Sequence, residues 1–368
     1  MTEQVILFLC KEEELREVQR GYSWAFAKHA RVIFWEPIMK DGCHGSTSVD
    51  LLLFLEQLSL KPMLILYPEA SPCLPWGLAQ VDIPTACFHI DTYGFMHHRI
   101  RWSMLFDYTF VFHPGFDKIF HQAGIPRAIM LAHAADATLF QELRDDERIY
   151  EVGWVGRLDS CLYARRRRVL ALLAERFRMN DWLRRHSQEE MADVYRHSKI
   201  VVNVSVESYP QENNLRLFEA MSAGALLMTV VPTELTQLGF QEGEHFVGYR
   251  NAKEIVDLVS YYLTHEQERS NIAKAGREKV LLEHTYDQRV KNLLSIIEKD
   301  KGELFAPARR WPEVQVRQLY LDYYTSYLLL DDSVRQIGHL KRFGPLAILK
   351  ALLPFLKAIV RALRMALT

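Results

Sequence analysis

Short apolar runs alternate with stretches of helical periodicity through the first 290 residues of the chain. Five of the runs are short, rich in β-branched or aromatic residues and bounded by turn residues, which predicts buried strands. They span residues 5–10, 32–35, 63–67, 85–89 and 108–112. Between them, residues 14–29 and 49–58 carry apolar side chains at helical spacing. This alternation predicts a parallel sheet covered by helices on both faces.

A second alternating series follows the charged segment 141–150, which has little to bury and is the predicted linker. Its predicted strands are 151–156, 200–206 and 226–231, and its predicted helices are 164–177, 188–198, 213–223, 252–263 and 267–284. Ser187 and Glu190 have the spacing of a capping box, and Gly224 fits the position just after a helix. Two consecutive α/β halves predict a pair of Rossmann-like domains facing a central cleft, with ligands beyond the carboxyl ends of the strands.

We place the domain boundaries where the pattern changes. The first Rossmann-like domain is predicted at 1–148 and the second at 149–285, followed by a crossover helix and helical extension at 286–338 and a cationic amphipathic tail at 339–368.

The composition is that of a globular protein, and its charge is unevenly distributed. The 368 residues are 49% hydrophobic and 25% charged, which excludes a disordered chain. The net charge is −1, which gives no support to a nucleic-acid binder. From residue 339 onward there are six basic residues and no acidic ones, which leaves 39 basic against 46 acidic residues in the rest of the chain.

The five cysteines are scattered and contain no CxxC pair, which predicts a reducing compartment and no metal cluster. The apolar stretch at 5–10 is flanked by acidic residues and predicts a strand rather than a signal peptide. No uncharged run reaches the roughly 18–20 residues of a membrane span. We therefore expect a cytoplasmic protein, soluble or peripheral on the inner face of the membrane.

The segment 205–229, SVESYPQENNLRLFEAMSAGALLMT, is the most informative about a ligand site. It reads as strand, loop, helix, glycine and strand, so the amide groups at the helix start, Asn213, are expected to face the cleft and to bind a diphosphate. Glu219 lies six residues further on, about 9 Å along the helix, where a carboxylate suits a ribose diol. Arg216 could neutralise phosphate charge. The alternative is that Glu219 and Arg216 are solvated helix residues.

The run from Asn214 to Gly224, NLRLFEAMSAG, resembles the N-x-R-x-F-E-A-x-x-x-G signature of the spore-maturation-protein-like (CgeB-like) glycosyltransferases, which are related to the retaining GT-B enzymes. Further segments resemble the family in order and spacing. They are 152–156 followed by Arg165, 189–203, the H-T-Y-x-x-R run from His284 to Arg289, and, more weakly, 83–91 and 134–136.

The resemblance implies a GT-B fold and transfer of a sugar from a nucleotide-diphosphate sugar to an acceptor hydroxyl, with retention and without a metal or cofactor. It places Gly156, Gln211, Glu212, Asn213, Asn214, Arg216 and Glu219 at the substrate. One position departs from the pattern of the related Glu-x7-Glu enzymes, because Gln211 stands where their first glutamate contacts the donor sugar.

Catalytic groups are expected from both halves. Arg157 and Arg165 are the candidates for stabilising the departing diphosphate, and the other arginines of the run 165–168 are expected in solvent. The sequence has no DxD motif where a metal-dependent transferase would carry one, so no metal site is expected. His89 and Asp91, at the end of a predicted strand, could contact the sugar or act as the base, although a histidine there is often structural.

Two other functions stay open: a nucleotide-sugar epimerase, and a degenerate sugar-nucleotide-binding scaffold. The acceptor is expected to be a glycan, a lipid-linked sugar or a protein, in envelope or surface glycan synthesis. The tail 343–368 places Lys350, Lys357, Arg361 and Arg364 on one face of a helix with a kink or break at Pro354. It predicts binding to an anionic membrane, or alternatively packing on the protein itself or on a second subunit.

Overall fold

The computed structural model describes residues 4–35, 50–58, 60–70, 74–140, 143–144, 147–205, 209 and 213–366. The chain forms two compact units. The first unit combines residues 1–131 with 294–368, and the second consists of residues 132–293. Each unit has its own hydrophobic core around its own sheet.

The first boundary differs from the one expected at residue 148, and Arg148 gives the reason. Its guanidinium is buried and donates to the carbonyl oxygens of Ser198 at 2.7 Å and Gly224 at 2.9 Å, both in the second unit. Arg148, just before the first strand of the second unit, is therefore fixed to that unit. The predicted linker 141–150 was expected to have little to bury, and the burial of Arg148 corrects this expectation.

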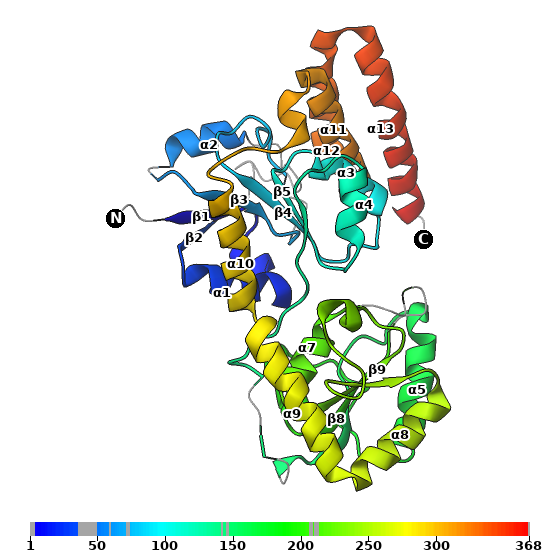
Figure 1. The fold of residues 1–368 in the computed structure, drawn as a ribbon. Coiled ribbons are helices and arrows are strands. Elements are labelled where there is room, and N and C mark those ends of the chain that lie inside the picture. Colours follow the sequence, from blue (N-terminus) through cyan, green and yellow to red (C-terminus); the bar gives the residue numbers. More distant parts are fainter. Residues whose placement is uncertain are drawn as a thin grey trace. The chain divides into compact units, whose positions relative to one another are not determined.

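The first unit contains a six-stranded sheet whose strands are all parallel, in the order β2-β1-β3-β4-β5-β6 (Figure 1). The strands are β1 (Val5–Phe8), β2 (Arg31–Phe34), β3 (Leu64–Tyr67), β4 (Thr85–His89), β5 (Tyr108–Val111) and β6 (Ala128–Met130). The helices between them are α1 (Glu17–Ala27), α2 (Leu51–Gln57), α3 (Met96–Ser103) and α4 (Phe116–Gln122). All five predicted strands are present, so the alternating pattern is confirmed in this unit.

The residues after 294 belong to the first unit because they pack on its sheet. Their helices are the end of α10 (Tyr286–Lys299), α11 (Glu313–Ser326), α12 (Leu330–Leu340) and α13 (Pro345–Ala366). Arg309 forms a bidentate pair with the fully buried Asp107, with nitrogen–oxygen distances of 2.8 and 2.7 Å. Tyr320 and Tyr324 on α11 donate hydroxyl hydrogens to the carbonyl oxygens of Pro75 and Leu74. The helical extension is thus part of the first core.

Helix α13 lies alongside α11 and α12 and runs without interruption through Pro354 (Figure 1). The break considered at Pro354 is therefore absent. No helix among the described residues is long and apolar enough to cross a membrane.

The second unit contains a four-stranded parallel sheet in the order β10-β9-β8-β7. Its strands are β7 (Tyr150–Gly153), β8 (Ser198–Asn203), β9 (Leu226–Val230) and β10 (Val247–Tyr249). Its helices are α5 (Ala164–Ala174), α6 (Gln188–Arg196), α7 (Leu215–Ser222), α8 (Ala252–Thr264) and α9 (Glu266–Glu283). Both parallel sheets with intervening helices match the predicted α/β class.

Two local signals fixed helix ends in this unit. Ser187 accepts a hydrogen bond from the Glu190 amide at 3.2 Å, and Glu190 accepts one from the Ser187 amide at 2.9 Å, which completes the predicted capping box. Gly224 has a φ of +70°, a left-handed conformation that ends α7 and favours glycine.

Candidate functional site

Asn203 joins the carboxyl ends of three neighbouring strands in the second unit. It is the last residue of β8 and is fully buried. Its Nδ2 donates to Oγ1 of Thr229 in β9 at 3.0 Å, and its carbonyl oxygen accepts the hydroxyl of Tyr249, the last residue of β10, at 2.8 Å. Burial raises the pKa of Tyr249, so its hydroxyl remains a proton donor. These bonds fix the sheet edge at which parallel α/β sheets bind ligands.

Arg216, in the first turn of α7, ties this edge to the loop after β7. Its Nη1 donates to Asn203 Oδ1 at 2.7 Å, and its Nη2 donates to the carbonyl oxygen of Val155 at 2.7 Å. The guanidinium also lies 5.3 Å from the ring centre of Trp154, which is fully buried. Arg216 therefore connects the start of α7 to the end of β8 and to the β7 loop, and the solvated role considered for it is wrong. Its predicted contact with a phosphate stays a prediction.

Gly156 lies directly against this arginine. A Cβ added at Gly156 would come within 2.6 Å of Arg216 Nη2 and 2.9 Å of the Trp154 ring. Only a residue without a side chain fits between the two, so the glycine allows the close approach of the β7 loop to α7.

The start of α7 is the predicted diphosphate site. The helix begins at Leu215, and the side chain of its N-cap residue, Asn214, makes no capping hydrogen bond. The Nδ2 of Asn214 donates instead to Asn203 Oδ1 at 3.2 Å. The amide of Asn213 donates to Glu234 Oε2 at 2.8 Å, and Glu234 also accepts the Tyr209 hydroxyl. Glu234 thus anchors the loop that leads into the helix. Gln211 and Glu212 lie outside the described residues.

Glu219 lies four residues beyond Leu215, where α7 begins, which is about 6 Å along the helix. This is shorter than expected, because the helix begins two residues later than the sequence indicates. Its side chain is only 4% exposed, so the alternative of a solvated helix glutamate is wrong. The ribose contact stays a prediction.

The arginines after β7 have three different environments. Arg157 is two-thirds exposed and pairs with Asp159 at 3.4 Å. Arg165 is half-buried on α5 and forms no hydrogen bond or ion pair with the described residues, although its charge acts on Tyr249. Arg166 is buried and donates to the carbonyl oxygens of Val204 at 2.8 Å and Arg157 at 3.0 Å. The expectation that Arg166 lies in solvent is wrong. Its hydrogen bonds connect the chain after β7, at Arg157, to the chain after β8, at Val204.

The motif from His284 to Arg289 packs against α7 through His284. The His284 ring lies between Phe218 of α7 and Phe240, with ring centres 5.4 and 4.8 Å away. Arg289 donates to His284 Nδ1 at 2.6 Å and to the carbonyl oxygen of Ala132 at 3.1 Å. Burial, reinforced by the Arg289 charge, lowers the pKa of His284 to about 3, so this ring is a neutral packing element.

In the first unit, His89 ends β4 and is completely buried. Its Nε2 lies 2.6 Å from Ser103 Oγ, and its Nδ1 lies 3.2 Å from Arg99 Nη1. Burial, with the Arg99 charge, holds its pKa well below the usual value. Both ring nitrogens are therefore engaged within the protein, as in a structural histidine. Catalysis by His89 stays a prediction.

Asp91, two residues later, is exposed. Near it lies an ion pair between Glu69 and Arg99 that sequence reasoning missed. Glu69, two residues after the end of β3, forms an ion pair with Arg99 and accepts a hydrogen bond from the Ile90 amide at 2.8 Å. Burial raises the pKa of Glu69 against the opposing Arg99 charge. The available signal was Pro68-Glu69 directly after the apolar run that forms β3.

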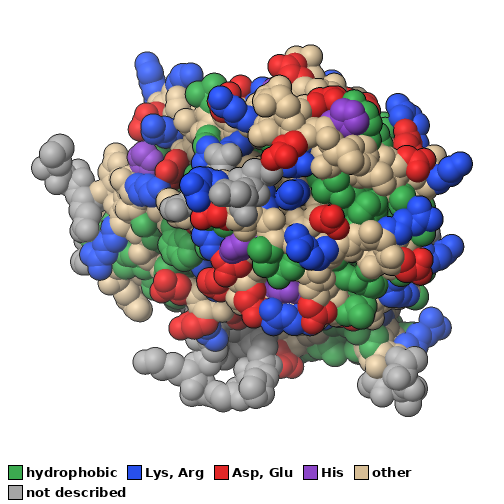
Figure 2. Space-filling view, turned by 90° about the horizontal axis from the view of Figure 1, so that it is seen from below, with side chains coloured by type: hydrophobic (Ala, Val, Ile, Leu, Met, Phe, Trp, Pro, Cys, Tyr) green, Lys and Arg blue, Asp and Glu red, His purple; other side chains and the backbone are tan. Residues whose placement is uncertain are grey.

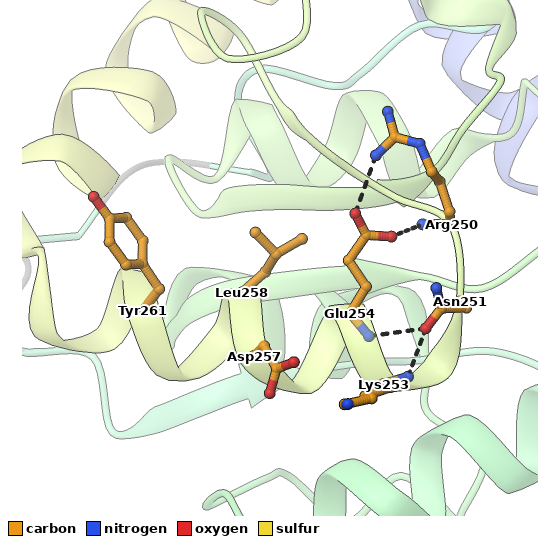
Figure 3. Close-up of a pocket in the computed structure, with 7 residues that line it drawn as sticks. All are labelled: Arg250, Asn251, Lys253, Glu254, Asp257, Leu258 and Tyr261. Atoms are coloured by element: carbon orange, nitrogen blue, oxygen red, sulfur yellow. Dashed lines mark hydrogen bonds and ion pairs between the residues drawn. The ribbon is translucent and has the colours of Figure 1, made fainter.

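A hollow of about 620 Å³ beside α8 is a separate feature (Figure 3). Glu254 accepts from the Arg250 amide at 2.6 Å and from its Nη1 at 3.0 Å, and Asn251 accepts from the amides of Lys253 and Glu254. These polar groups serve as the N-terminal cap of the helix, as the dashed lines in Figure 3 show. The hollow contains none of the predicted site residues.

Comparisons with known proteins bear on this site. Residues 140–295 match the glycosyl transferase-like family. That range contains Asn203, Arg216, Gly156 and Glu219, so the similarity to this family covers these residues. No curated protein sequence matches the chain.

Solved structures resemble the chain over most of its length. Sucrose-phosphate synthase from Thermosynechococcus elongatus has a TM-score of 0.56 and 15% identity over 81% of this chain and 98% of its own. Anabaena HepE in complex with UDP and glucose has a TM-score of 0.55 and 14% identity, over 80% of this chain and 100% of its own. A glycosyltransferase from Rickettsia africae ESF-5 has a TM-score of 0.60 and 9% identity, over 81% of this chain and 99% of its own. The chain therefore has the GT-B fold, with a C-terminal helical extension.

Proposed function

We propose that this chain is a glycosyltransferase that uses a nucleotide-diphosphate sugar and binds its diphosphate at the start of α7. The observation that carries the proposal is the strand edge joined by Asn203, where Arg216 fixes the β7 loop beside a helix start that its N-cap residue, Asn214, does not cap. The amide groups and the dipole of such a helix start favour an anion.

In the proposed reaction the acceptor oxygen forms a bond to the anomeric carbon as the bond from that carbon to the diphosphate breaks. The acceptor proton passes to the departing phosphate oxygen, on the same face of the sugar, and the anomeric configuration is retained. Arg165 is the proposed cation for the departing charge, since its charge acts on Tyr249 at the same strand edge and it forms no hydrogen bond or ion pair with the described residues. Arginines and helix amides can stabilise this charge without a metal ion.

Further observations bear on the subfamily, the donor and the cellular location. The run from Asn214 to Gly224 supports membership of the CgeB-like group. Uridine nucleotides are the first donors to test, because the similar structure of HepE is also known in complex with UDP-glucose. Cys87 and Cys161 form no disulfide with the described residues, which supports a cytoplasmic location, where envelope or surface glycans begin their synthesis.

A screen of nucleoside diphosphates and nucleotide sugars by thermal unfolding tests the proposal. A ligand at 100 times its dissociation constant should stabilise the chain by about 2.7 kcal/mol. Stabilisation followed by slow release of free sugar supports a transferase. Stabilisation with conversion of one nucleotide sugar into another identifies an epimerase, and stabilisation without turnover identifies a binding scaffold.

A further inference from the structure

Helix α13 presents its large apolar residues to solvent. Leu346, Leu349, Leu353, Leu356, Val360 and Leu363 are each at least 50% exposed. Their spacings of three and four residues place them in one continuous row along the helix. An exposed apolar row of this length marks a surface that another body covers.

The opposite side of α13 carries the packing, and it uses small residues. Ala347, Ala351 and Ala358 are at most 8% exposed, and the first two pack with Leu321 of α11 and Leu340 of α12. The helix is therefore already held on the first unit through its alanines. Its leucine row remains available to a further partner.

A basic edge borders the leucine row. Lys350, Lys357, Arg361 and Arg364 are exposed, and their spacing confines them to an arc of about 60° beside the row. By contrast, the face of the molecule in Figure 2 mixes basic and acidic side chains. The charge of α13 is thus concentrated and of one sign.

A hollow of about 270 Å³ adjoins this edge and extends it onto α3. His97, His98, Arg101, Lys357 and Arg361 contribute to its lining. The acidic residue among the described lining residues, Asp322, is paired with Arg101. The hollow therefore offers cationic and neutral donors to an anion of phosphate size.

We propose that the leucine row, the basic edge and this hollow form a docking surface for an anionic lipid bilayer. The leucines enter the interface between headgroups and acyl chains, while the basic edge and the hollow contact lipid phosphates. The inference is independent of sugar transfer, because binding to a lipid surface requires no nucleotide.

The charge pattern argues against a second copy of the chain as the occupant. If two leucine rows met antiparallel, the rows of Lys350, Lys357 and Arg364 would face each other with like charges. If they met parallel, these residues would face Leu352 and Ile359 rather than acidic partners. An anionic bilayer can bury the leucine row and also pair its phosphates with the basic edge.

Sedimentation of the full chain with phosphatidylcholine vesicles, with and without phosphatidylglycerol, tests the inference. We expect binding only to the anionic vesicles, weakened by salt. Leu353→Gln/Leu356→Gln should lower the partition coefficient at least tenfold. Leu183→Gln/Leu282→Gln is the matched control, since both leucines are 69% exposed elsewhere, and it should bind like the unchanged chain.

Charge is tested separately by Lys350→Glu/Lys357→Glu. Each basic residue near an anionic surface contributes about fivefold, so the loss should be about 25-fold or more. Lys253→Glu/Lys291→Glu makes the same charge change at exposed positions of the second unit and should have no effect. Equal binding of all variants, or a dimer in light scattering that only the Leu353/Leu356 variant dissociates, would overturn the inference.

Discussion

Arg216 Nη1 lies 2.7 Å from Asn203 Oδ1, and this bond joins the first turn of α7 to the end of β8. Because the same guanidinium also holds the carbonyl oxygen of Val155, one side chain sets the positions of the helix start and of the β7 loop. Any ligand bound by the amides of α7 therefore depends on a residue whose observed contacts are within the protein.

Replacing Arg216 with lysine should weaken nucleotide binding while preserving the charge. A lysine ammonium cannot reproduce the planar fork that reaches Val155 and Asn203 together. Loss of these charged hydrogen bonds should cost about 1.5–3 kcal/mol. Calorimetric titration with UDP measures the affinity, and Arg168→Lys, at an exposed position of α5, is the control. Equal affinity in both variants would contradict the positioning role.

Gly156→Ala should reduce nucleotide affinity because the new methyl group would displace Arg216 Nη2, 2.6 Å from its position. The effect should resemble that of Arg216→Lys, and combining the two changes should add little. Gly338→Ala on α12 is the control, since nothing lies within 4 Å of the added atom. A Gly156→Ala variant with normal affinity would show that the close approach is dispensable.

Treatment with EDTA should leave sugar transfer unchanged. Arginine side chains and the α7 amides are proposed to stabilise the departing diphosphate in place of a metal ion. Initial rates with EDTA, with Mg²⁺ and with Mn²⁺ measure this. A strict requirement for either cation would contradict the metal-independent mechanism. It would not contradict the proposed nucleotide site at the start of α7.

Acid should destabilise the second unit through His284. Its pKa is about 3 in the folded chain and near 6.5 when unfolded, so the unfolded chain binds more protons between these values. Stability is therefore complete above pH 6.5 and falls as the pH is lowered toward 3. Lowering the pH from 7 to 5 should cost about 2 kcal/mol. Urea unfolding should show a smaller loss for His284→Gln, and identical losses would contradict this assignment.

Much of the fold follows from local pattern, as β4 illustrates. The apolar run 85–89 was predicted with both ends correct, because a buried parallel strand needs a short unbroken apolar segment. Helix α3 was missed, since its sequence MHHRIRWS is mostly polar and its N-cap residue, Phe95, has a φ of +52°. Strand β10 has three residues, too few for periodicity to detect.

The candidate site was only partly predictable. The signature run placed α7, Arg216 and Glu219, but it could not show that Arg216 bonds to Asn203, 13 residues earlier. Glu234 anchors the Asn213 amide from 21 residues away, and neither residue's type nor spacing indicates this contact. Arg166 resembles its neighbours in sequence and is distinguished only by its burial. Contacts made by the folded chain decide such roles.

Release of nucleoside diphosphate from a panel of nucleotide sugars, by the unchanged chain and by Glu219→Gln, tests the central claim most directly. Glutamine keeps the size of Glu219 but accepts fewer hydrogen bonds and carries no charge. We predict turnover of at least one nucleotide sugar by the unchanged chain, and a loss of about 1.5–3 kcal/mol in nucleotide affinity for a folded Glu219→Gln variant. No turnover of any nucleotide sugar, together with equal nucleotide affinity in the two proteins, would contradict the account.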